Sequence, residues 1–242
     1  MDLLLIAAVA AIASALTFVS GFGLGTLLLP AFALALPVAE AVAATAVVHL
    51  LNNLFKGGLL RRRADWRTVL RFGLPAVPAA MLGGWLLGRV TAPGPVVGLV
   101  LMLLAMLELW PRFQRLRAPG WAMPVGGALT GFLGGLSGQQ GALRSVFLLR
   151  SGMEADRFIA TGVMIAVLID VSRMTSYAAT MTVPSGRDAL LVAAGATAAL
   201  LVSAIAVRRI EKVTIGVVRG TVAGMLLLIG AAFALGLIGG PA

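Results

Sequence analysis

Apolar runs long enough to cross a lipid bilayer follow one another along almost the whole chain. About 30 Å of hydrocarbon needs about 17–25 apolar residues in a helix. The chain is 60% hydrophobic and only 12% charged, with a mean hydropathy of +1.03, whereas soluble domains carry about 25% charged residues. Such a chain has too little polar surface to cover a water-soluble globule. The sequence therefore predicts an integral membrane protein with no room for a soluble domain.

The runs predict helices, because only helices and closed barrels satisfy backbone polar groups in lipid, and the alternating pattern of barrel strands is missing. We therefore expect an all-α polytopic membrane protein. The first run has neither a basic flank nor a cleavage site, so we expect it to belong to the mature protein. The expected helical segments are Leu3–Val19, Thr26–Leu36, Ala39–Phe55, Thr68–Leu87, Val96–Trp110, Trp121–Leu136, Ala142–Leu149, Phe158–Ala179, Ala189–Val207 and Ile215–Ile238.

A glycine-rich break interrupts the apolar pattern twice, at residues 20–26 (SGFGLGT) and 135–141 (GLSGQQG). Gly25 and Gly141 are 116 residues apart, and so are Thr45 and Thr161, which follow the two breaks. One spacing relates two separate landmarks, so the sequence predicts a duplicated unit. We place the repeats at residues 1–117 and 118–242, each with one broken helix and three full spans.

Basic residues cluster in four places along the chain, all between apolar runs or next to one. Such clusters mark the cytoplasmic side of a membrane, and this accounts for the formal charge of +10 better than a nucleic-acid partner. The run Ala39–Phe55 then crosses inward and its duplicate, Phe158–Ala179, crosses outward, so the repeats are inverted. We expect the bacterial inner (plasma) membrane, with both termini outside. The clusters comprise Lys56, Arg61, Arg62, Arg63, Arg67 and Arg71; Arg112, Arg115 and Arg117; Arg150 and Arg157; and Arg208, Arg209 and Lys212.

Paired breaks in inverted repeats are typical of the binding site in secondary transporters. A half-helix that starts inside the membrane has unpaired N–H groups and a positive dipole end, which favour an anion. The alternative is that the glycines only allow helices to pack closely. The candidate substrate-binding residues at the breaks are Ser20, Gly21, Gly23, Gly25, Thr26, Ser137, Gly138, Gln139, Gln140 and Gly141.

Polar residues that follow the breaks extend this candidate site. Thr45, His49 and Asn52 are spaced four and three apart, which predicts one shared helix face beside Asn53. This face either lines the pathway or ties helices together, and His49, the only histidine, is a candidate for proton coupling. Thr161 is the duplicate of Thr45 and a further candidate.

Charged residues inside the apolar runs are costly and mark function or pairing. Arg144 either contacts an anionic substrate or reaches the cytoplasmic surface. Asp170 and Arg173 lie three apart, which predicts an intramembrane ion pair, with a gate or coupling role as the alternative. Asp170 lies on the helix face opposite Thr161, which argues against one ligand touching both.

The chain resembles the sulfite exporter TauE/SafE family over essentially its whole length. The resemblance rests on residues 21–30 (GFGLGTLLLP), 63–66 (RADW) and 131–138 (GFLGGLSG), and on the Ala-Thr pairs that end at Thr45 and Thr161. It implies transport of a small anion such as sulfite, a sulfonate like sulfoacetate, or a related organic acid. Gln139, Gln140, Arg144 and Ser145 depart from the family's pattern and indicate a more polar or differently shaped anion.

Two other function classes remain open. The sequence GLSG at residues 135–138 matches the nucleophile motif of rhomboid-type intramembrane serine proteases, but His49 precedes the serine instead of following it. A passive anion channel is the second alternative. We expect neither ATP, metal nor other cofactor, because the sequence carries no nucleotide-binding loop or ligand cluster. The expected partners are the small anion and the lipid bilayer, and a homodimer stays open.

Overall fold

The computed structural model describes residues 2–20, 23–110, 120–148, 153–180, 186–206 and 215–238. These ranges are helical and contain no strand, which confirms the predicted all-α class. Each expected segment overlaps one of the observed helices. The elements are α1 (Asp2–Ser20), α2 (Leu24–Ala33), α3 (Val38–Leu60), η1 (Arg61–Arg63), α4 (Trp66–Leu87), α5 (Pro93–Leu109), η2 (Gly120–Ala122), α7 (Met123–Ser137), α8 (Gly141–Leu148), α9 (Ala155–Thr180), α10 (Gly186–Ala206) and α11 (Ile215–Ala234).

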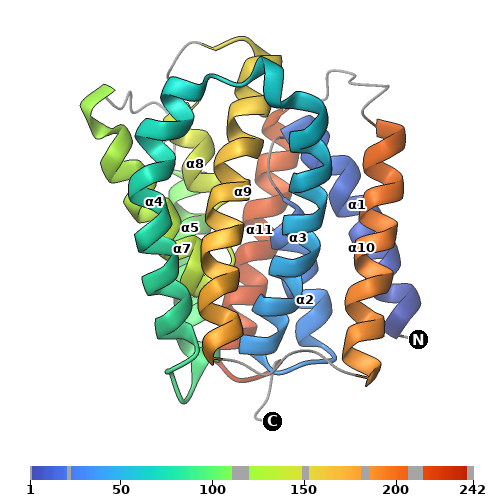
Figure 1. Cartoon of the computed structure of the whole chain (residues 1–242). Coiled ribbons are helices and arrows are strands. Elements are labelled where there is room, and N and C mark those ends of the chain that lie inside the picture. Colours follow the sequence, from blue (N-terminus) through green and yellow to red (C-terminus); the bar gives the residue numbers. More distant parts are fainter. Residues whose placement is uncertain are drawn as a thin grey trace.

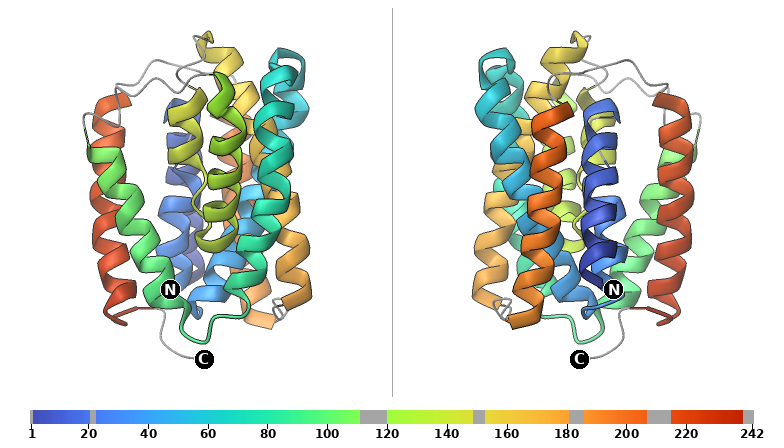
Figure 2. Two further views of the ribbon diagram at one scale, coloured as in Figure 1. Left: turned by 90° about the vertical axis from the view of Figure 1, so that its left-hand side faces the viewer. Right: turned by 90° about the vertical axis from the view of Figure 1, so that its right-hand side faces the viewer.

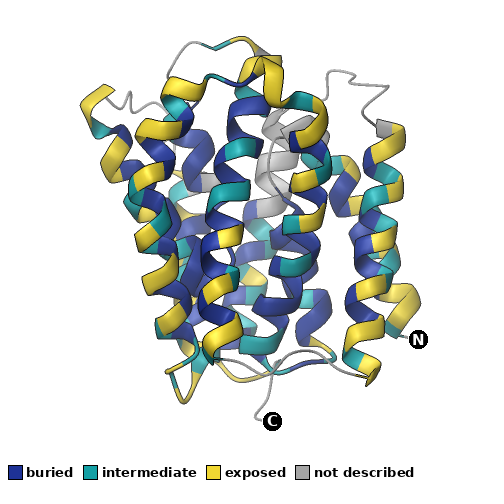
Figure 3. Ribbon diagram, viewed as in Figure 1, coloured by how far each residue is buried: buried dark blue, intermediate teal, exposed yellow. Residues whose placement is uncertain are grey.

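The outer surface of the helix bundle is suited to lipid. Within the described ranges, α3, α4, α9 and α10 are each long and apolar enough to cross a membrane. Large apolar side chains point outward, including Leu4 and Leu228, which are 80% and 74% exposed. Figure 3 shows the buried residues gathered where helices face one another and the exposed residues on the outward faces. Exposed apolar surface of this extent is typical of a protein whose solvent is hydrocarbon.

Two helical hairpins enter the bundle from opposite ends (Figures 1 and 2). The α1–α2 hairpin opens toward the end where the chain begins, and the α7–α8 hairpin opens toward the other end. The long helices α3 and α9 lie side by side between them and run in opposite directions. The breaks therefore lie in the interior of the bundle, where the tips of the hairpins face each other.

The helices pack in two bundles that each mix the two halves of the sequence. In the first bundle α10 packs against α1 and α3, and in the second α4 packs against α7 and α9. The first bundle lies on the right in Figure 1 and the second on the left, and α5 packs against α11. One helix of each half has thus crossed to the other bundle, so the sequence halves are not separate structural units.

The contact between α4 and α7 is made by backbone against backbone. Gly127, Gly131 and Gly135 are spaced by one helical turn and face α4. A Cβ atom at these positions would lie 2.0–2.2 Å from the carbonyl oxygens of the α4 residues Phe72, Ala76 and Ala80. Small residues at such spacing let membrane helices approach closely. For these three glycines, close helix packing is therefore the role that the structure shows.

The helix ends that adjoin the basic clusters lie together, at the end of the bundle opposite the start of α1 (Figure 1). Seven residues of these clusters lie outside the described residues: Arg112, Arg115, Arg117, Arg150, Arg208, Arg209 and Lys212. Trp66, Trp110 and Trp121 lie at this end and are exposed, as interfacial tryptophans are. The prediction that Lys56 belongs to a basic loop is wrong. The helix α3 continues to Leu60, so Lys56 lies inside it and is only 2% exposed.

Candidate functional site

The two breaks touch each other at what we call the break crossing, formed by Gly25, Thr26, Gly138 and Gln139. The Thr26 hydroxyl donates a hydrogen bond of 2.9 Å to the Gln139 side-chain oxygen. A Cβ atom on Gly25 would lie 3.3 Å from the Gly138 carbonyl oxygen. The two breaks, which are 116 residues apart in the sequence, therefore meet in the structure. Gly21 and the side chain of Ser20 lie outside the described residues.

Glycine is needed on both sides of the crossing because the backbone adopts positive φ there. Gly23 precedes α2 with a φ of 120°, and Gly138 ends α7 with a φ of 78°. Side chains rarely tolerate these conformations. The turn after α7 leads directly into α8, which begins at Gly141. The breaks are thus built by local backbone geometry.

We expect Gly138→Ala to destabilise the protein by about 1 kcal/mol, because the left-handed backbone conformation is less favourable for alanine than for glycine. The site is otherwise roomy, since the atoms nearest to an added Cβ lie 3.5 and 3.6 Å away. Thermal unfolding of the purified protein measures this change. A stability equal to that of the wild type would contradict the positive φ at this position.

The second break is tied to α9 through the carbonyl groups at the end of α7. Arg173 donates to the Gly134 oxygen at 3.2 Å, and Tyr177 donates to the Gly135 oxygen at 2.5 Å. The last carbonyls of a helix carry partial negative charge, so a cation and a hydroxyl stabilise them there. These α9 side chains hold the tip of the α7–α8 hairpin in place.

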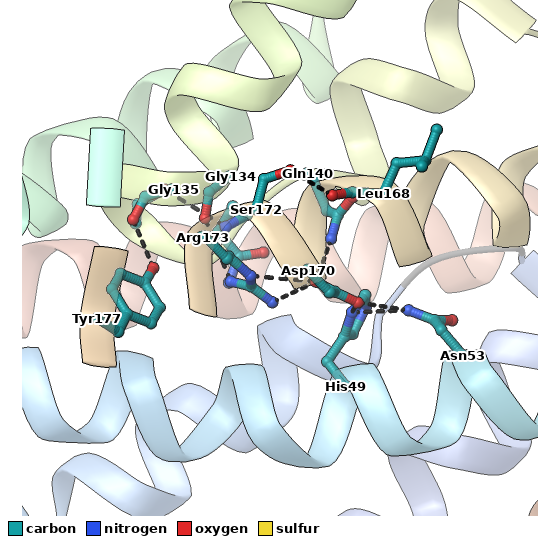
Figure 4. A network of polar contacts seen from close by, with 12 residues as sticks. His49, Asn53, Gly134, Gly135, Gln140, Leu168, Asp170, Ser172, Arg173 and Tyr177 are labelled. Carbon is teal, nitrogen blue, oxygen red and sulfur yellow. Dashed lines mark hydrogen bonds and ion pairs between the residues drawn. The ribbon is translucent and has the colours of Figure 1, made fainter. Parts of the chain in front are cut away.

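Asp170 is the centre of a buried polar network that joins α3, α7–α8 and α9 (Figure 4). Its Oδ1 accepts hydrogen bonds from Gln140 at 2.7 Å and from Arg173 at 2.7 and 3.1 Å. Its Oδ2 accepts from Asn53 at 2.9 Å and lies 2.7 Å from His49 Nδ1. We call these five residues the Asp170 network. The predicted ion pair between Asp170 and Arg173 is confirmed, and both side chains are fully buried.

The chemistry of the network determines where the imidazole carries a proton. A carboxylate oxygen accepts hydrogen bonds and does not donate them, so His49 Nδ1 must carry the proton that faces Asp170. Asn53 then donates to Asp170 and not to the imidazole nitrogen, although both lie within hydrogen-bond distance. Asp170 is therefore surrounded by donors and is held as a carboxylate.

Arg144 lies inside the bundle and not at the surface. It is 5% exposed and donates to the Gln140 side-chain oxygen at 3.1 Å. Gln140 thereby links the arginine to Asp170. The expectation that Arg144 reaches the cytoplasmic surface is therefore wrong. Its guanidinium lies in the protein interior, one helical turn beyond the break.

A cleft lies beside the Asp170 network, toward the end of the bundle that carries the basic clusters. It runs between the last turns of α3 and α8 and the first turns of α9. The sequence reasoning missed Lys56 in this wall, although its spacing of seven from His49 and three from Asn53 continues the same helix face. The cleft is lined by Thr17, His49, Asn53, Lys56, Arg144, Ser145, Leu148, Phe158, Ile159, Gly162 and Val163.

Two buried polar atoms beside the break crossing have no hydrogen-bond partner among the described residues. They are the Thr45 hydroxyl and the Gln139 side-chain nitrogen. Both side chains border Gly25, at 3.8 and 4.0 Å from the position of a Cβ atom there. A buried polar group without a partner costs about 1–3 kcal/mol. Such groups next to the start of α2 indicate a place for a polar ligand.

Two other candidates lie apart from the network and the crossing. Asn52 was expected to share the face of His49, but it accepts a hydrogen bond from Ser203 of α10 and so faces the first bundle. The helical turn brings Asn53 to Asp170 in its place. Thr161 accepts a hydrogen bond from the Asp65 backbone at 2.9 Å, near the start of α4. The structure therefore does not bring Asn52 or Thr161 to Asp170.

The Ser137 hydroxyl stabilises the turn in which it lies. It donates to the Leu133 oxygen of its own helix at 2.8 Å and accepts from the Gln139 backbone at 3.4 Å. A serine nucleophile needs a base within hydrogen-bond reach, whereas His49 is bound to Asp170. The geometry around Ser137 therefore gives no support to the protease alternative.

The comparisons with known proteins identify the family of the chain. A family model described as sulfite exporter TauE/SafE matches residues 6–233. No curated protein and no solved structure gave a significant match. The family match covers nearly the whole bundle, from α1 to α11, and includes both breaks. The chain belongs to the sulfite exporter TauE/SafE family of membrane transporters.

Proposed function

We propose that the protein is a secondary transporter that moves a small anion, such as sulfite, a sulfonate like sulfoacetate or a related organic anion, by alternating access. The observation that carries this proposal is the break crossing, where Thr45 and Gln139 keep unpaired polar atoms beside the start of α2. The N-terminal end of a half-helix favours an anion. The cleft with Lys56 and Arg144 offers such an anion a positively charged approach.

The helix arrangement supports the proposal of two inverted repeats. In this proposal α1–α5 of residues 1–117 correspond in order to α7–α11 of residues 118–242. The contact of α1 with α10 then corresponds to the contact of α7 with α4, and both are present. The contact of α3 with α10 likewise corresponds to that of α9 with α4. The contacts α3–α9 and α5–α11 each join two corresponding helices. Corresponding helices run in opposite directions in Figures 1 and 2. Such symmetry is typical of alternating-access transporters.

The moving units in this proposal are the two bundles and not the two sequence halves. His49 and Asn53 belong to α3 of the first bundle, whereas Asp170 and Arg173 belong to α9 of the second. Their hydrogen bonds cross the boundary between the bundles. Asp170 is therefore placed to link the occupancy of the site to bundle movement, and His49 is the candidate for proton coupling.

The membrane orientation in this proposal follows the basic clusters. The end of the bundle that carries them faces the cytoplasm of a bacterial inner membrane. Both chain ends then lie outside, because α1 begins and α11 ends at the opposite end (Figure 1). In this orientation the cleft is reached from the cytoplasm, which fits export.

Flux assays in proteoliposomes test the transport proposal. We expect uptake of sulfite or a sulfonate to be saturable. We also expect the same anion on the other side of the membrane to accelerate it, because an alternating-access transporter reorients faster when its site is occupied. A passive channel would show neither saturation nor this acceleration. No flux across a panel of sulfite, sulfonates and carboxylates would overturn the proposal. Flux that ignores an imposed pH gradient would remove only the proton coupling.

We expect Thr45→Val to lower anion flux about tenfold while leaving the protein at least as stable as the wild type. The hydroxyl has no partner within the described part of the chain, so its loss removes nothing from the fold, whereas a lost hydrogen bond to a charged ligand costs about 1.5–3 kcal/mol. Flux per folded protein and thermal unfolding measure the two effects.

Thr130→Val is the matched control for this prediction. The Thr130 hydroxyl is also buried and unpaired among the described residues, but it lies seven residues before the end of α7. We expect it to leave flux unchanged. Equal effects of the two substitutions would remove the break crossing from the anion site.

A further inference from the structure

His49 presents its two ring nitrogens to different surroundings (Figure 4). Both polar contacts that the described residues make with the ring involve Nδ1, and they come from Asp170 and Asn53. Nε2 has no hydrogen-bond partner among the described residues, and the side chain is 11% exposed where it lines the cleft. Because Nδ1 carries the proton that faces Asp170, the neutral ring presents Nε2 to the cleft as an unprotonated acceptor.

The imidazole lies beside the proposed path of the anion. It lines the cleft, and Thr45, whose hydroxyl has no partner among the described residues, lies one helical turn before it on α3. The lone pair of a neutral Nε2 repels the oxygen atoms of an anion. A proton on Nε2 turns the same atom into a charged donor, from which an anion accepts a hydrogen bond. The anion and the proton therefore favour each other's binding.

Charged groups face the ring of His49 from α9 and α8. Asp170 of α9 lies against Nδ1 and stabilises an imidazolium, whereas Arg173 of α9 and Arg144 of α8 oppose a further positive charge. Lys56 lies two turns further along α3, in the wall of the cleft. The described parts of α2, α5 and α10, which also pack against α3, have no charged residue at this level, and the arginines of η1 are exposed. An anion in the cleft adds a negative charge on the Nε2 side, which shifts the balance toward imidazolium.

We propose that the protein carries one proton together with each anion, and that this proton binds at Nε2 of His49 in direct contact with the anion. The inference rests on the proposed transport function and adds the proton-binding atom and the direction of coupling. The proton passes from solvent to Nε2 and returns to solvent when the anion leaves. Asp170 is a positioning residue, which holds the ring with Nε2 toward the cleft. Net transport follows the sum of the two gradients, so an anion accumulated in the cytoplasm leaves together with a proton.

Nitrogen NMR of protein with isotope-labelled histidine reads this site alone, because His49 is the only histidine. Methanesulfonate and ethanesulfonate are suitable probes, since neither changes its charge near neutral pH. We expect the neutral ring of the free protein to carry its proton on Nδ1. We also expect the better-bound probe to raise the fraction of imidazolium at constant pH, because linkage between two ligands is reciprocal. A neutral ring protonated on Nε2, or an imidazolium fraction that the anion leaves unchanged, would overturn the inference.

The affinity for the same probe should fall as pH rises. We expect binding about tenfold or more tighter at about pH 5.5 than at about pH 8.5, because a hydrogen bond from a charged group changes affinity by about 10–100-fold and histidine titrates in this range. Calorimetric titration measures the affinity. Repeating it in two buffers of different ionisation enthalpy counts the protons taken up, which should approach one per anion.

Two variants remove the titratable nitrogen in different ways. His49→Asn places an amide nitrogen near the position of Nδ1, so it keeps a donor for Asp170 but has no counterpart of Nε2. His49→Gln places its amide near the position of Nε2. We expect both variants to take up no proton and to bind the probe with nearly the same affinity at both pH values. Thr45→Val is the matched control, because it weakens binding at both pH values and keeps the wild-type ratio.

Proteoliposomes test the direction of coupling. With equal probe on both sides, an imposed pH gradient should drive the probe toward the alkaline side, because the proton and the anion move together. Accumulation on the acidic side would mean exchange and would overturn the inference, as would a pH-dependent affinity that persists in both histidine variants. Saturable anion flux that continues in these cases leaves the transport proposal standing, whereas absence of flux for every anion tested would overturn both.

Discussion

Replacing Asp170 by asparagine is expected to cost about 3–5 kcal/mol of folding free energy and to abolish transport. Asparagine keeps the shape of the side chain but removes the charge that compensates the fully buried Arg173. It also turns one acceptor oxygen into a donor, which then faces the donors of its neighbours. The Asp170 network connects both bundles, so its loss affects the fold and the proposed transport cycle together.

Unfolding of the purified protein by heat or by detergent measures the stability change, and anion flux per folded protein measures the second effect. Asp156→Asn is the matched control. Asp156 forms an ion pair with Arg63 at 2.6 Å, but the two side chains are 57% and 61% exposed, and exposed pairs contribute about 0–1 kcal/mol. A loss for Asp170→Asn no larger than for Asp156→Asn would contradict the proposed importance of the network.

A double variant separates stability from function. In Asp170→Asn with Arg173→Gln, both buried charges are gone, so we expect much of the stability to return. Transport should remain lost, because the link from α3 to α9 is no longer ionic. Restored transport in the double variant would show that Asp170 and Arg173 are only a structural pair.

The helices could be predicted from the sequence because lipid leaves the backbone few options. Apolar runs and glycine breaks predicted each described helix, and the basic clusters predicted which helix ends lie together. Local charge spacing also predicted the Asp170–Arg173 pair, since residues three apart share a helix face. These features depend on neighbours in the chain, and a single sequence contains that information.

The site itself was only partly predictable, because its contacts join distant parts of the chain. His49 and Asp170 are 121 residues apart, and no local pattern pairs them. The rotation of α3 about its own axis turns Asn53, and not Asn52, toward Asp170. The sequence does not show this rotation to within one residue. Lys56 was placed in a basic loop because composition does not show that α3 extends to Leu60.

The exchange of α4 and α10 between the bundles was also beyond the sequence. A duplicated sequence indicates two halves, and the simplest reading is that each half packs with itself. Here the glycines of α7 bring that helix against the α4 backbone, and Gly73 and Gly84 of α4 make room for side chains of α9. Shape complementarity between the helix surfaces determines which helices pack together, and hydropathy contains no information on this shape.

The α4–α7 contact gives the second large prediction, that Gly131→Ala destabilises the protein by about 3 kcal/mol or more. The added Cβ would lie 2.2 Å from the Ala76 oxygen and 2.8 Å from the Ala76 Cα atom. No rotamer change can relieve a clash with backbone, so the two helices must separate along their length. Overpacking costs typically about 1–3 kcal/mol and more where the backbone must move. Thermal unfolding and the yield of folded protein measure the effect.

Gly58→Ala is the same chemical change in a helix where nothing lies within 4 Å of the added atom. It should stabilise the protein by about 0.5–1 kcal/mol, because alanine loses less backbone entropy than glycine. Ala76→Gly should fail to rescue Gly131→Ala, since the clash involves the Ala76 backbone and not its methyl group. Rescue by Ala76→Gly, or equal effects of the two glycine substitutions, would mean that α4 and α7 are held apart by side chains.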